Sequence, residues 1–448
     1  MRNWGILICM IISVGTGVFA ETIGLEEVRA LALANSRSLA KYNLGIQSAL
    51  LDEKSRVYSN LPSLSLGASA SMSLWSAQNS APIENPFDTF SAGASFGVSQ
   101  RIFEGGKSIY QKAINEIATE SARLDVQAEY FNVLDSADSA YYAVLEAAAT
   151  LEAEEASLEA SLASLAIAEI RQASGMINQG DYLKALAEKE TRENSRNQAR
   201  RNLSLSITKL KALIGLSGLP ELEQIDFSGY EELIQHLGNI SDEEADALYN
   251  QFWKLLAAAN PSLAKSSLAR NRAEKNLSMT KSGYSPTLSA SFSTGLNYTI
   301  DRGLEYSGGR VSLSASIPID YWVLSNSVQK SQIANNTAAL DYISAEVALD
   351  TELQTALLNA FANAGSVISS RRSLEYAEKH FEYIMERYRL SQSSISDVGE
   401  ATTLLINSRN SYTRSSYGFL QSLSKLCSLG AIDDEEKLLR LLLGNSGS

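Results

Sequence analysis

Residues 61–74 have the sequence LPSLSLGASASMSL, in which apolar and small polar side chains alternate. Leucine, alanine and methionine occupy the even positions from 64 to 74, while serine and glycine occupy the odd positions between them. A period of two residues is typical of a β-strand with one apolar and one polar face. The stretch predicts a strand of about ten residues, the length that crosses a lipid bilayer when the strand is tilted.

Three further stretches, residues 92–98, 288–298 and 311–319, have the same alternation. Their polar positions hold mostly serine, glycine, threonine and asparagine, with no charge in the middle of any stretch. We expect strand pairs at residues 61–103 and 285–324. A soluble antiparallel sheet with one wet face has the same alternation and stays open as an alternative.

Aromatic residues at the ends of these stretches favour strands that cross a membrane. If the first and third strands run outward and the other two inward, the aromatic residues form two belts at the interfaces. One belt contains Trp75, Phe90 and Tyr298, and the other contains Phe103, Tyr321 and Trp322. Four strands cannot close a barrel, and an open edge in lipid leaves amides unpaired. Chains must therefore pool strands, and three chains make the smallest barrel with room for a lumen.

The chain is a tandem duplication with a period of about half its length. The segment 34–40 recurs as 259–264, and Pro62 corresponds to Pro286. Later in the chain, Asp181 corresponds to Asp397. Each half is therefore expected to contain the same elements in the same order.

Helices are expected in the rest of each half. Residues 104–173 and 325–390 contain no proline and have apolar residues at spacings of three and four. At 1.5 Å per residue, each run spans roughly 100 Å, a length typical of coiled coils. Helical segments are expected over residues 21–60, 104–215, 242–284 and 325–430. A small mixed subdomain at mid-height is expected from residues 216–241, with a C-terminal tail at 431–448.

Composition excludes several classes of function. Residues 1–20 are expected to be a secretory signal peptide, with Arg2 before an apolar stretch and Ala20 at a cleavage site. The chain has 51 acidic and 38 basic residues, and this net charge of −13 argues against a nucleic-acid partner. Two histidines and two cysteines leave no cysteine–histidine zinc site. No nucleophile motif or pair of catalytic acids occurs, so we expect neither an enzyme nor a cofactor.

Three isolated residues are given structural roles. We expect His236 and His380 at the surface or at an interface, and Cys427 in a packed apolar environment.

The order of elements resembles that of the TolC family of outer-membrane efflux proteins, also called outer membrane factors. The resemblance covers nearly the whole chain after the signal peptide, and it is carried by short motifs that occur in order in a duplicated frame. These motifs are Leu25-Glu26-Glu27-Val28, Leu61-Pro62-Ser63-Leu64, Phe103-Glu104-Gly105-Gly106-Lys107 and Asn260-Pro261-Ser262-Leu263. Gly105 and Gly106 are interpreted as the turn from a strand into a helix.

The resemblance implies a mixed α and β fold that assembles as a homotrimer. Four strands of each chain contribute to a twelve-stranded barrel in the outer membrane, and long helices continue it as a coiled-coil tunnel through the periplasm. A periplasmic adaptor protein, an inner-membrane transporter and outer-membrane lipid are the implied partners. The implied function is an exit duct for efflux or type I secretion, opened by rearrangement of the coiled-coil tip. A non-channel exported coiled-coil protein with a structural or adhesive role is the alternative.

The resemblance places the periplasmic tip, where an adaptor docks, at two helix-to-helix turns. Gly175, Met176 and Asp181 belong to the first turn, and Leu390 and Ser391 to the second. Ser391 stands where the family has a glycine. Ser393 stands where the family often has an arginine that links the coils.

Asp397 and Glu400 match the carboxylates that ring the closed entrance in the family. Three copies of each on a threefold axis make rings of like charge, which admit cations and repel one another. Structural roles within the helix are alternatives to the role in a charge ring. Asp397, or Ser396 in its place, is a helix N-cap after the turn, and Glu400 is a first-turn acid favoured by the helix dipole.

Overall fold

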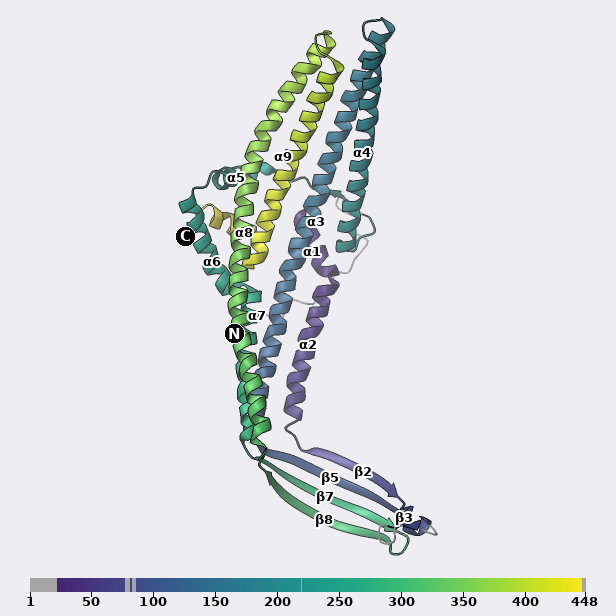
Figure 1. Ribbon diagram of the computed structural model, residues 1–448, viewed down its shortest axis with the longest axis vertical. Helices are drawn as coiled ribbons and strands as arrows, with labels where there is room; N and C mark the ends of the chain where they lie inside the picture. The colour runs from purple at the N-terminus through teal and green to yellow at the C-terminus, as the bar shows by residue number, and fades with distance from the viewer. Residues whose placement is uncertain (1–21, 77–80, 83–85, 219, 445–448) are drawn as a thin grey trace. The chain divides into compact units, whose positions relative to one another are not determined.

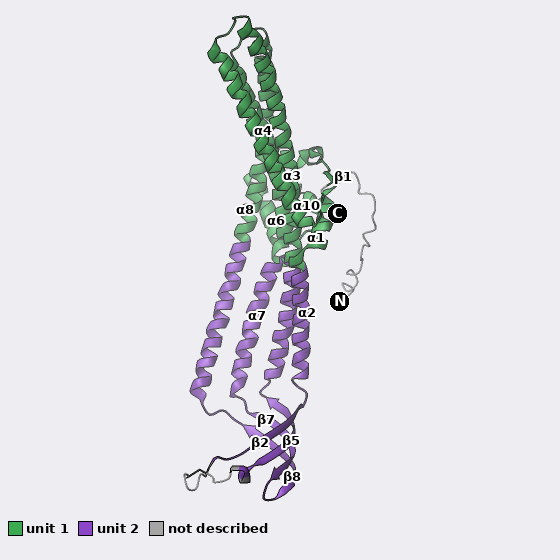
Figure 2. Ribbon diagram, turned by 90° about the vertical axis from the view of Figure 1, so that its right-hand side faces the viewer, with its two compact units in different colours: residues 1–39, 129–259, 350–448 green, residues 40–128, 260–349 purple. Residues whose placement is uncertain are grey.

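The computed structural model describes residues 22–76, 81–82, 86–218 and 220–444, so the expected signal peptide lies outside the described residues. The chain divides into two compact units, shown in green and purple in Figure 2. Unit 1 contains residues 1–39, 129–259 and 350–448, and unit 2 contains residues 40–128 and 260–349. Each unit therefore combines segments from both halves of the duplicated sequence.

Unit 2 contains an antiparallel sheet with the strand order β2-β5-β7-β8 (Figure 1). Its strands are β2 (Ser63–Ser71), β5 (Ser91–Glu104), β7 (Thr287–Thr299) and β8 (Gly303–Ser316). Pairing of β5 with β7 joins the two repeats. Along the chain, β2 and β5 are separated by the short strands β3 (Trp75–Ser76) and β4 (Ala81–Pro82) and by the 3-10 turn η1 (Pro86–Thr89). Within the described chain, β2 and β8 are edge strands that keep one open side each.

The strand register separates polar from apolar side chains on the sheet. Ser63 lies opposite Ser99 with their hydroxyl oxygens 2.6 Å apart, and Ser289 and Ser314 make a similar contact at 2.8 Å. The other face carries leucine, valine and phenylalanine. Leu66, for example, is 84% exposed. Apolar surface left in water is unfavourable by about 25 cal/mol per Å², so this face requires an apolar neighbour, either lipid or protein.

The helices of unit 2 flank each strand pair in sequence. Helices α2 (Arg37–Tyr58) and α7 (Pro261–Lys281), the latter followed by the 3-10 turn η3 (Ser282–Tyr284), precede the pairs. The long helices α3 (Lys107–Ala173) and α8 (Tyr321–Arg389) follow the pairs and continue into unit 1. Lys265 of α7 forms an ion pair with Asp125 of α3. Within the described part of the chain, no helix combines the length and the apolar character that crossing a lipid bilayer requires.

Unit 1 contains the remaining parts of α3 and α8, together with the returning helices α4 (Gln179–Ile214) and α9 (Ile395–Gly430). Its smaller elements are β1 (Thr22–Ile23), α1 (Leu25–Asn35), β6 (Glu221–Leu222), η2 (Phe227–Tyr230), α5 (Glu231–Gly238), α6 (Asp242–Ala259) and α10 (Glu435–Leu442). Helix α10 packs against α5 and α9. Its Leu438 and Leu442 are fully buried, as are Phe252 and Leu256 of α6 and Phe419 of α9. The C-terminal tail therefore contributes to the core of this unit.

A buried ion pair joins three elements of unit 1. Arg29 of α1 donates hydrogen bonds to both carboxylate oxygens of Asp138 on α3, at 2.6 and 2.7 Å. Ser424 of α9 donates to the same carboxylate at 2.6 Å. Burial lowers the pKa of Arg29, but the hydrogen bond to Asp138 and the charge of that carboxylate outweigh burial, so the pKa is raised overall. The Arg29 guanidinium therefore stays charged in its contact with Asp138.

Two expected helices are broken, each at the matching place in its repeat. The helix expected over residues 21–60 is interrupted at Ser36, which is extended and whose hydroxyl accepts from the amide of Leu39. The helix expected over residues 242–284 is interrupted at Asn260, whose side chain caps α7. The break at Asn260 follows from Pro261, since the residue before a proline disfavours helical geometry.

The second strand pair is shorter than its expected range of 285–324. Strand β8 ends at Ser316, and Tyr321 and Trp322 form the first turn of α8. Pro318 has no amide hydrogen for a strand ladder, which explains why pairing stops just before it.

Candidate functional site

The two helix-to-helix turns of unit 1 have the same backbone geometry. They connect α3 to α4 and α8 to α9 over residues 174–178 and 390–394. Gly175 has a φ of 69° and Ser391, 216 positions later, has a φ of 62°. In both turns the next amide donates to the carbonyl five residues before it at 2.8 Å. The serine that replaces glycine therefore adopts the left-handed conformation that the turn requires.

Side-chain caps follow both turns. The side chain of Asn178 accepts from the amide of Asp181 at 2.9 Å. The hydroxyl of Ser394 accepts from the amide of Asp397 at 3.2 Å, while a carboxylate oxygen of Asp397 accepts from the amide of Ser394 at 2.8 Å. The expectation that Asp397 or Ser396 is the N-cap is therefore wrong. Ser394 is the N-cap, and Asp397 closes a capping box from the third helical position.

The expected tip residues lie in exposed positions at these turns. Met176 is 73% exposed and Leu390 is 59% exposed, so each turn presents an apolar side chain to its surroundings. Asp397 and Glu400 are both exposed on the first turns of α9 and, three residues apart, share one side of the helix. The hydrogen bonds from the backbone and hydroxyl of Ser394 hold the pKa of Asp397 below its usual range. No hydrogen bond or ion pair of the Glu400 side chain is found among the described residues.

Two buried arginines join the first helical hairpin to the second. Arg171 of α3 donates to the backbone carbonyl of Tyr388 on α8, and its guanidinium lies 4.4 Å from the centre of the Tyr388 ring. Arg192 of α4 donates to Glu188 on its own helix at 2.6 Å and to the hydroxyl of Thr403 on α9 at 2.7 Å. Both arginines are only 9% exposed. Sequence reasoning missed them, because an arginine that faces another helix carries no sequence signal that separates it from one in water.

Apolar side chains complete the interface between the hairpins. One buried cluster contains Leu165, Ala168 and Ala185 from the first hairpin. A second contains Met385, Tyr388 and Val398 from the second hairpin, with Ile167 of α3 packed against it. Ile395 packs against both clusters. The hairpins are therefore held together by polar tethers around a shared apolar contact.

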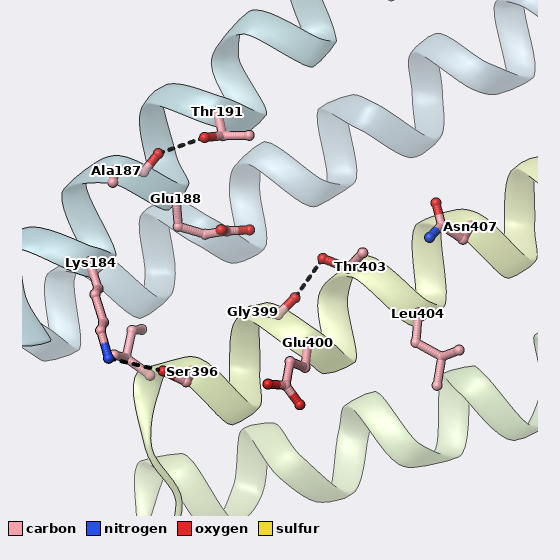
Figure 3. Close-up of a pocket in the computed structure, with 11 residues that line it drawn as sticks. Lys184, Ala187, Glu188, Thr191, Ser396, Gly399, Glu400, Thr403, Leu404 and Asn407 are labelled. Carbon is pink, nitrogen blue, oxygen red and sulfur yellow. Dashed lines mark hydrogen bonds between the residues drawn. The ribbon is translucent and has the colours of Figure 1, made fainter.

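A groove of about 660 Å³ lies between α4 and α9 next to this interface (Figure 3). Its lining includes Lys184, Glu188 and Thr191 of α4, and Ser396, Glu400 and Thr403 of α9. The Lys184 amine lies 3.5 Å from the Ser396 hydroxyl near one end of the groove. Because the groove is open and follows two helices, it suits a helical segment of a partner protein better than an enclosed small molecule.

Gly105 and Gly106 lie between β5 and α3, with φ values of 63° and 82°. At Gly105 an added Cβ would stand 2.6 Å from the carbonyl oxygen of Ser282. The turn from strand into helix therefore needs glycine at this position for both backbone conformation and space.

The six residues of the two expected aromatic belts lie on or next to different elements of unit 2. Tyr298 pairs with Ala92 and Phe103 pairs with Leu288, at opposite ends of the β5–β7 ladder and on the apolar face. Trp75 lies in β3, and Phe90 lies just before β5. Tyr321 stacks on Tyr284 with ring centres 6.0 Å apart, and Trp322 beside it is 71% exposed. The structure thus places the last two on a helix, not on a strand.

The isolated residues show no arrangement for chemistry. His380 is exposed on α8, and His236 lies half-buried on α5. Burial raises the pKa of the Cys427 thiol to about 12, which makes this thiol unreactive. Among the described residues, no group of three or more histidine, cysteine or acidic side chains is placed to hold a metal ion.

Comparison with known sequences shows a match to one protein family. The sequence matches the outer membrane efflux protein family over residues 28–216 and 253–430. Outer membrane protein TolC of Escherichia coli K12 is 24% identical over 393 residues, which cover 84% of this chain and 76% of that protein.

Solved structures share the fold. The CmeC outer membrane channel of Campylobacter jejuni has a TM-score of 0.74 and 18% identity, with 94% of this chain and 89% of that chain covered. The outer membrane protein VceC of Vibrio cholerae has a TM-score of 0.71 and 17% identity, with 91% and 96% covered. The expected fold class, long coiled-coil helices combined with four strands in each chain, is confirmed.

Proposed function

This chain belongs to the outer membrane efflux protein family, and from that premise we propose that it is an exit duct of the outer membrane. Three chains assemble, and the strands of unit 2 contribute to a twelve-stranded barrel in the lipid. The long helices line a tunnel in the periplasm. The duct serves efflux or type I secretion and performs no chemistry, in keeping with a family of channels.

The sheet of unit 2 is the observation that carries the proposal. It has an exposed apolar face, a face of serine and glycine, and open edges at β2 and β8. In lipid, each unpaired backbone group at such an edge costs several kcal/mol. Pairing of β8 with β2 of a neighbouring chain removes both edges, puts the apolar face against lipid and leaves the serine face around a lumen.

The tip of the helical hairpins is the proposed entrance. Asp397 and Glu400 supply rings of negative charge when three copies meet around an axis, so the closed entrance prefers cations. Opening requires the hairpins to move apart, which must break the tethers made by Arg171 and Arg192. Asp397 therefore has two roles, since its carboxylate also closes the cap of α9.

The turns at the ends of the helical hairpins are the proposed docking site of a periplasmic adaptor, because the groove between α4 and α9 is lined in part by Glu400, which is assigned to the entrance. Gly175 and Ser391 lie in these turns, and Met176 and Leu390 present exposed apolar side chains to a partner there. Asp181 lies at the start of α4 and contributes negative charge there. An inner-membrane transporter then delivers the substrate through the adaptor.

A pair of adjacent substitutions on β8 tests the proposal. Val311 lies on the apolar face and Ser312 on the polar face. We expect Val311→Lys to oppose insertion by about 2–4 kcal/mol, because the charge would face lipid, whereas Ser312→Lys inserts normally. The measurement is the fraction of protein that stays with outer membranes after washing in high salt.

Purified trimers of the native chain are further expected to conduct ions in planar lipid bilayers. A native chain that stays monomeric, leaves the membrane on washing and never conducts would contradict the proposal. That result would favour an exported structural or adhesive coiled-coil protein whose strands form a soluble sheet.

A further inference from the structure

One row of paired residues crosses the middle of the sheet on its polar face. Ser65 of β2 pairs with Gly97 of β5, Gly97 pairs with Ser293 of β7, and Ser293 pairs with Arg310 of β8. Directly paired residues in an antiparallel sheet project to the same face. Arg310 therefore shares the face of serine and glycine, and it is the eighth of the fourteen residues of β8.

Arg310 lacks a neutralising neighbour within the part of the chain that the structure describes. It is exposed, and no hydrogen bond or ion pair of its side chain is found among the described residues. Arg101 on the same face lies near the end of β5 and is paired with Glu104 at 2.6 Å. Glu305 of the same strand pairs with Asn297, four residues along β7 from Ser293, which places it about 14 Å from Arg310 along the strands. That separation exceeds the distance of about 8 Å beyond which exposed charges are largely screened at physiological salt.

The strand of the neighbouring chain that closes the barrel supplies no carboxylate either. The open edge beside β8 would meet β2 of the next chain, and β2 consists only of serine, leucine, glycine and alanine. A guanidinium is charged at every physiological pH. Its charge at mid-strand therefore remains uncompensated in a wall of hydroxyls and glycine.

From this placement we propose that Arg310 is a selectivity residue, which forms a ring of three guanidinium groups inside the barrel and attracts anionic solutes. The inference rests on the proposed function, because it needs the trimeric barrel. Rings of arginine or lysine favour anions in pores. The duct thus carries negative rings at the tip and a positive ring within the strands, so these two places discriminate oppositely by charge.

The test measures the permeability of chloride relative to potassium in planar bilayers under a potassium chloride gradient. It uses the Asp397→Asn/Glu400→Gln background, so that the tip carboxylates do not dominate the measured selectivity. We expect Arg310→Ser to lower the chloride-to-potassium permeability ratio about twofold or more and Arg310→Glu to lower it further. Arg310→Lys, which retains the charge, is expected to restore most of the native ratio.

Inorganic triphosphate provides a second measurement on the same trimers. We expect it to reduce the ion current through channels that keep Arg310, or that carry Arg310→Lys, more strongly than through the Arg310→Ser channel. An unchanged permeability ratio in conducting Arg310→Ser and Arg310→Glu trimers would overturn the inference and leave the proposed duct intact. Trimers that fail to form or conduct even with Arg310 in place would overturn both.

Discussion

Ser391 carries a backbone conformation that side chains other than glycine rarely adopt. Its φ of 62° matches the 69° of Gly175 in the first turn. The left-handed conformation costs an L-residue roughly 1–2 kcal/mol. The hydrogen bonds that close the turn, including that from the Ser391 amide to the Tyr388 carbonyl, offset this cost.

Exchanging the residues at the two turns measures this cost. We expect Ser391→Gly to stabilise the second turn by about 1 kcal/mol, and Gly175→Ser to destabilise the first by a similar amount. Among the described residues, no heavy atom beyond the glycine and its chain neighbours lies within 4 Å of a Cβ built at Gly175, so backbone conformation alone is responsible there. Hydrogen exchange of the turn amides reports the change, and equal exchange in native chain and variants would contradict it.

Asp397 combines a cap with a charge. Because its pKa is lowered in the folded chain, its contribution to the stability of α9 is present above the ordinary pKa of an aspartate, about 3.9. The contribution is lost as the pH falls through the lowered value. At neutral pH the side chain is therefore both ionised and held in one orientation by Ser394.

Removal of the tip charges is expected to change ion selectivity. In Asp397→Asn/Glu400→Gln trimers, the preference for cations in planar bilayers should fall at neutral pH, because the negative rings are lost. Asparagine at 397 retains an acceptor for the Ser394 amide, so the cap is weakened only slightly. If the double variant keeps the native selectivity, these residues do not line the entrance.

At the scale of elements, the two hairpins are joined by repeat-related residues that have diverged. Arg171 and Arg387 are equivalent by the offset of 216. The Arg387 guanidinium donates to the carbonyl of Gln392 within its own turn at 3.0 Å. Arg171 instead binds the carbonyl and ring of Tyr388 on the other hairpin. Arg387 therefore stabilises its own turn, whereas Arg171 stabilises the interface between the hairpins.

Arg171 and Arg387 therefore provide a matched pair of variants that tests how the entrance is held closed. We expect Arg171→Gln to weaken the closed state by about 1.5–3 kcal/mol, the range for a hydrogen bond to a charged group, and to raise conductance in planar bilayers. Arg387→Gln should leave conductance close to native. Tyr388→Phe keeps the ring and the carbonyl and removes only the 3.5 Å contact of the Tyr388 hydroxyl with the Ser164 carbonyl, so its effect should be smaller than that of Arg171→Gln. Equal conductance in Arg171→Gln and native trimers would contradict a tethering role.

At the scale of the molecule, the core of unit 1 depends on contacts among segments far apart in sequence. Arg29, Asp138 and Ser424 come from α1, α3 and α9. Removing one partner of a buried ion pair leaves the other charge unpaired in a medium that solvates it poorly.

Loss of the arginine is therefore expected to destabilise the whole unit. Arg29→Met should lower the free energy of unfolding by about 3–5 kcal/mol, because Asp138 is left buried without its counter-ion. Thermal unfolding is the measurement. The double variant Arg29→Met/Asp138→Leu removes both charges and should recover much of the loss, whereas equal destabilisation in both variants would assign the effect to packing.

Local patterns were enough to predict the strands, the long helices, the duplicated order and the family. Alternation along residues 61–74 and the three-and-four spacing of residues 104–173 record which side of each element is buried, and both can be counted along the chain. The pattern wrongly placed Tyr321 and Trp322 in the strand pair, and it missed the helix breaks at Ser36 and Asn260. In these places a single proline or a local cap overrides the wider pattern.

Contacts between elements could be identified only from the tertiary structure. The partner of Arg171 depends on helix orientation, and the row that joins Ser65 to Arg310 depends on strand register. A shift of one residue in either would bring different side chains together without changing any local pattern. Composition along a single segment cannot record which residue of another segment lies opposite, because that choice is made by packing across the whole interface.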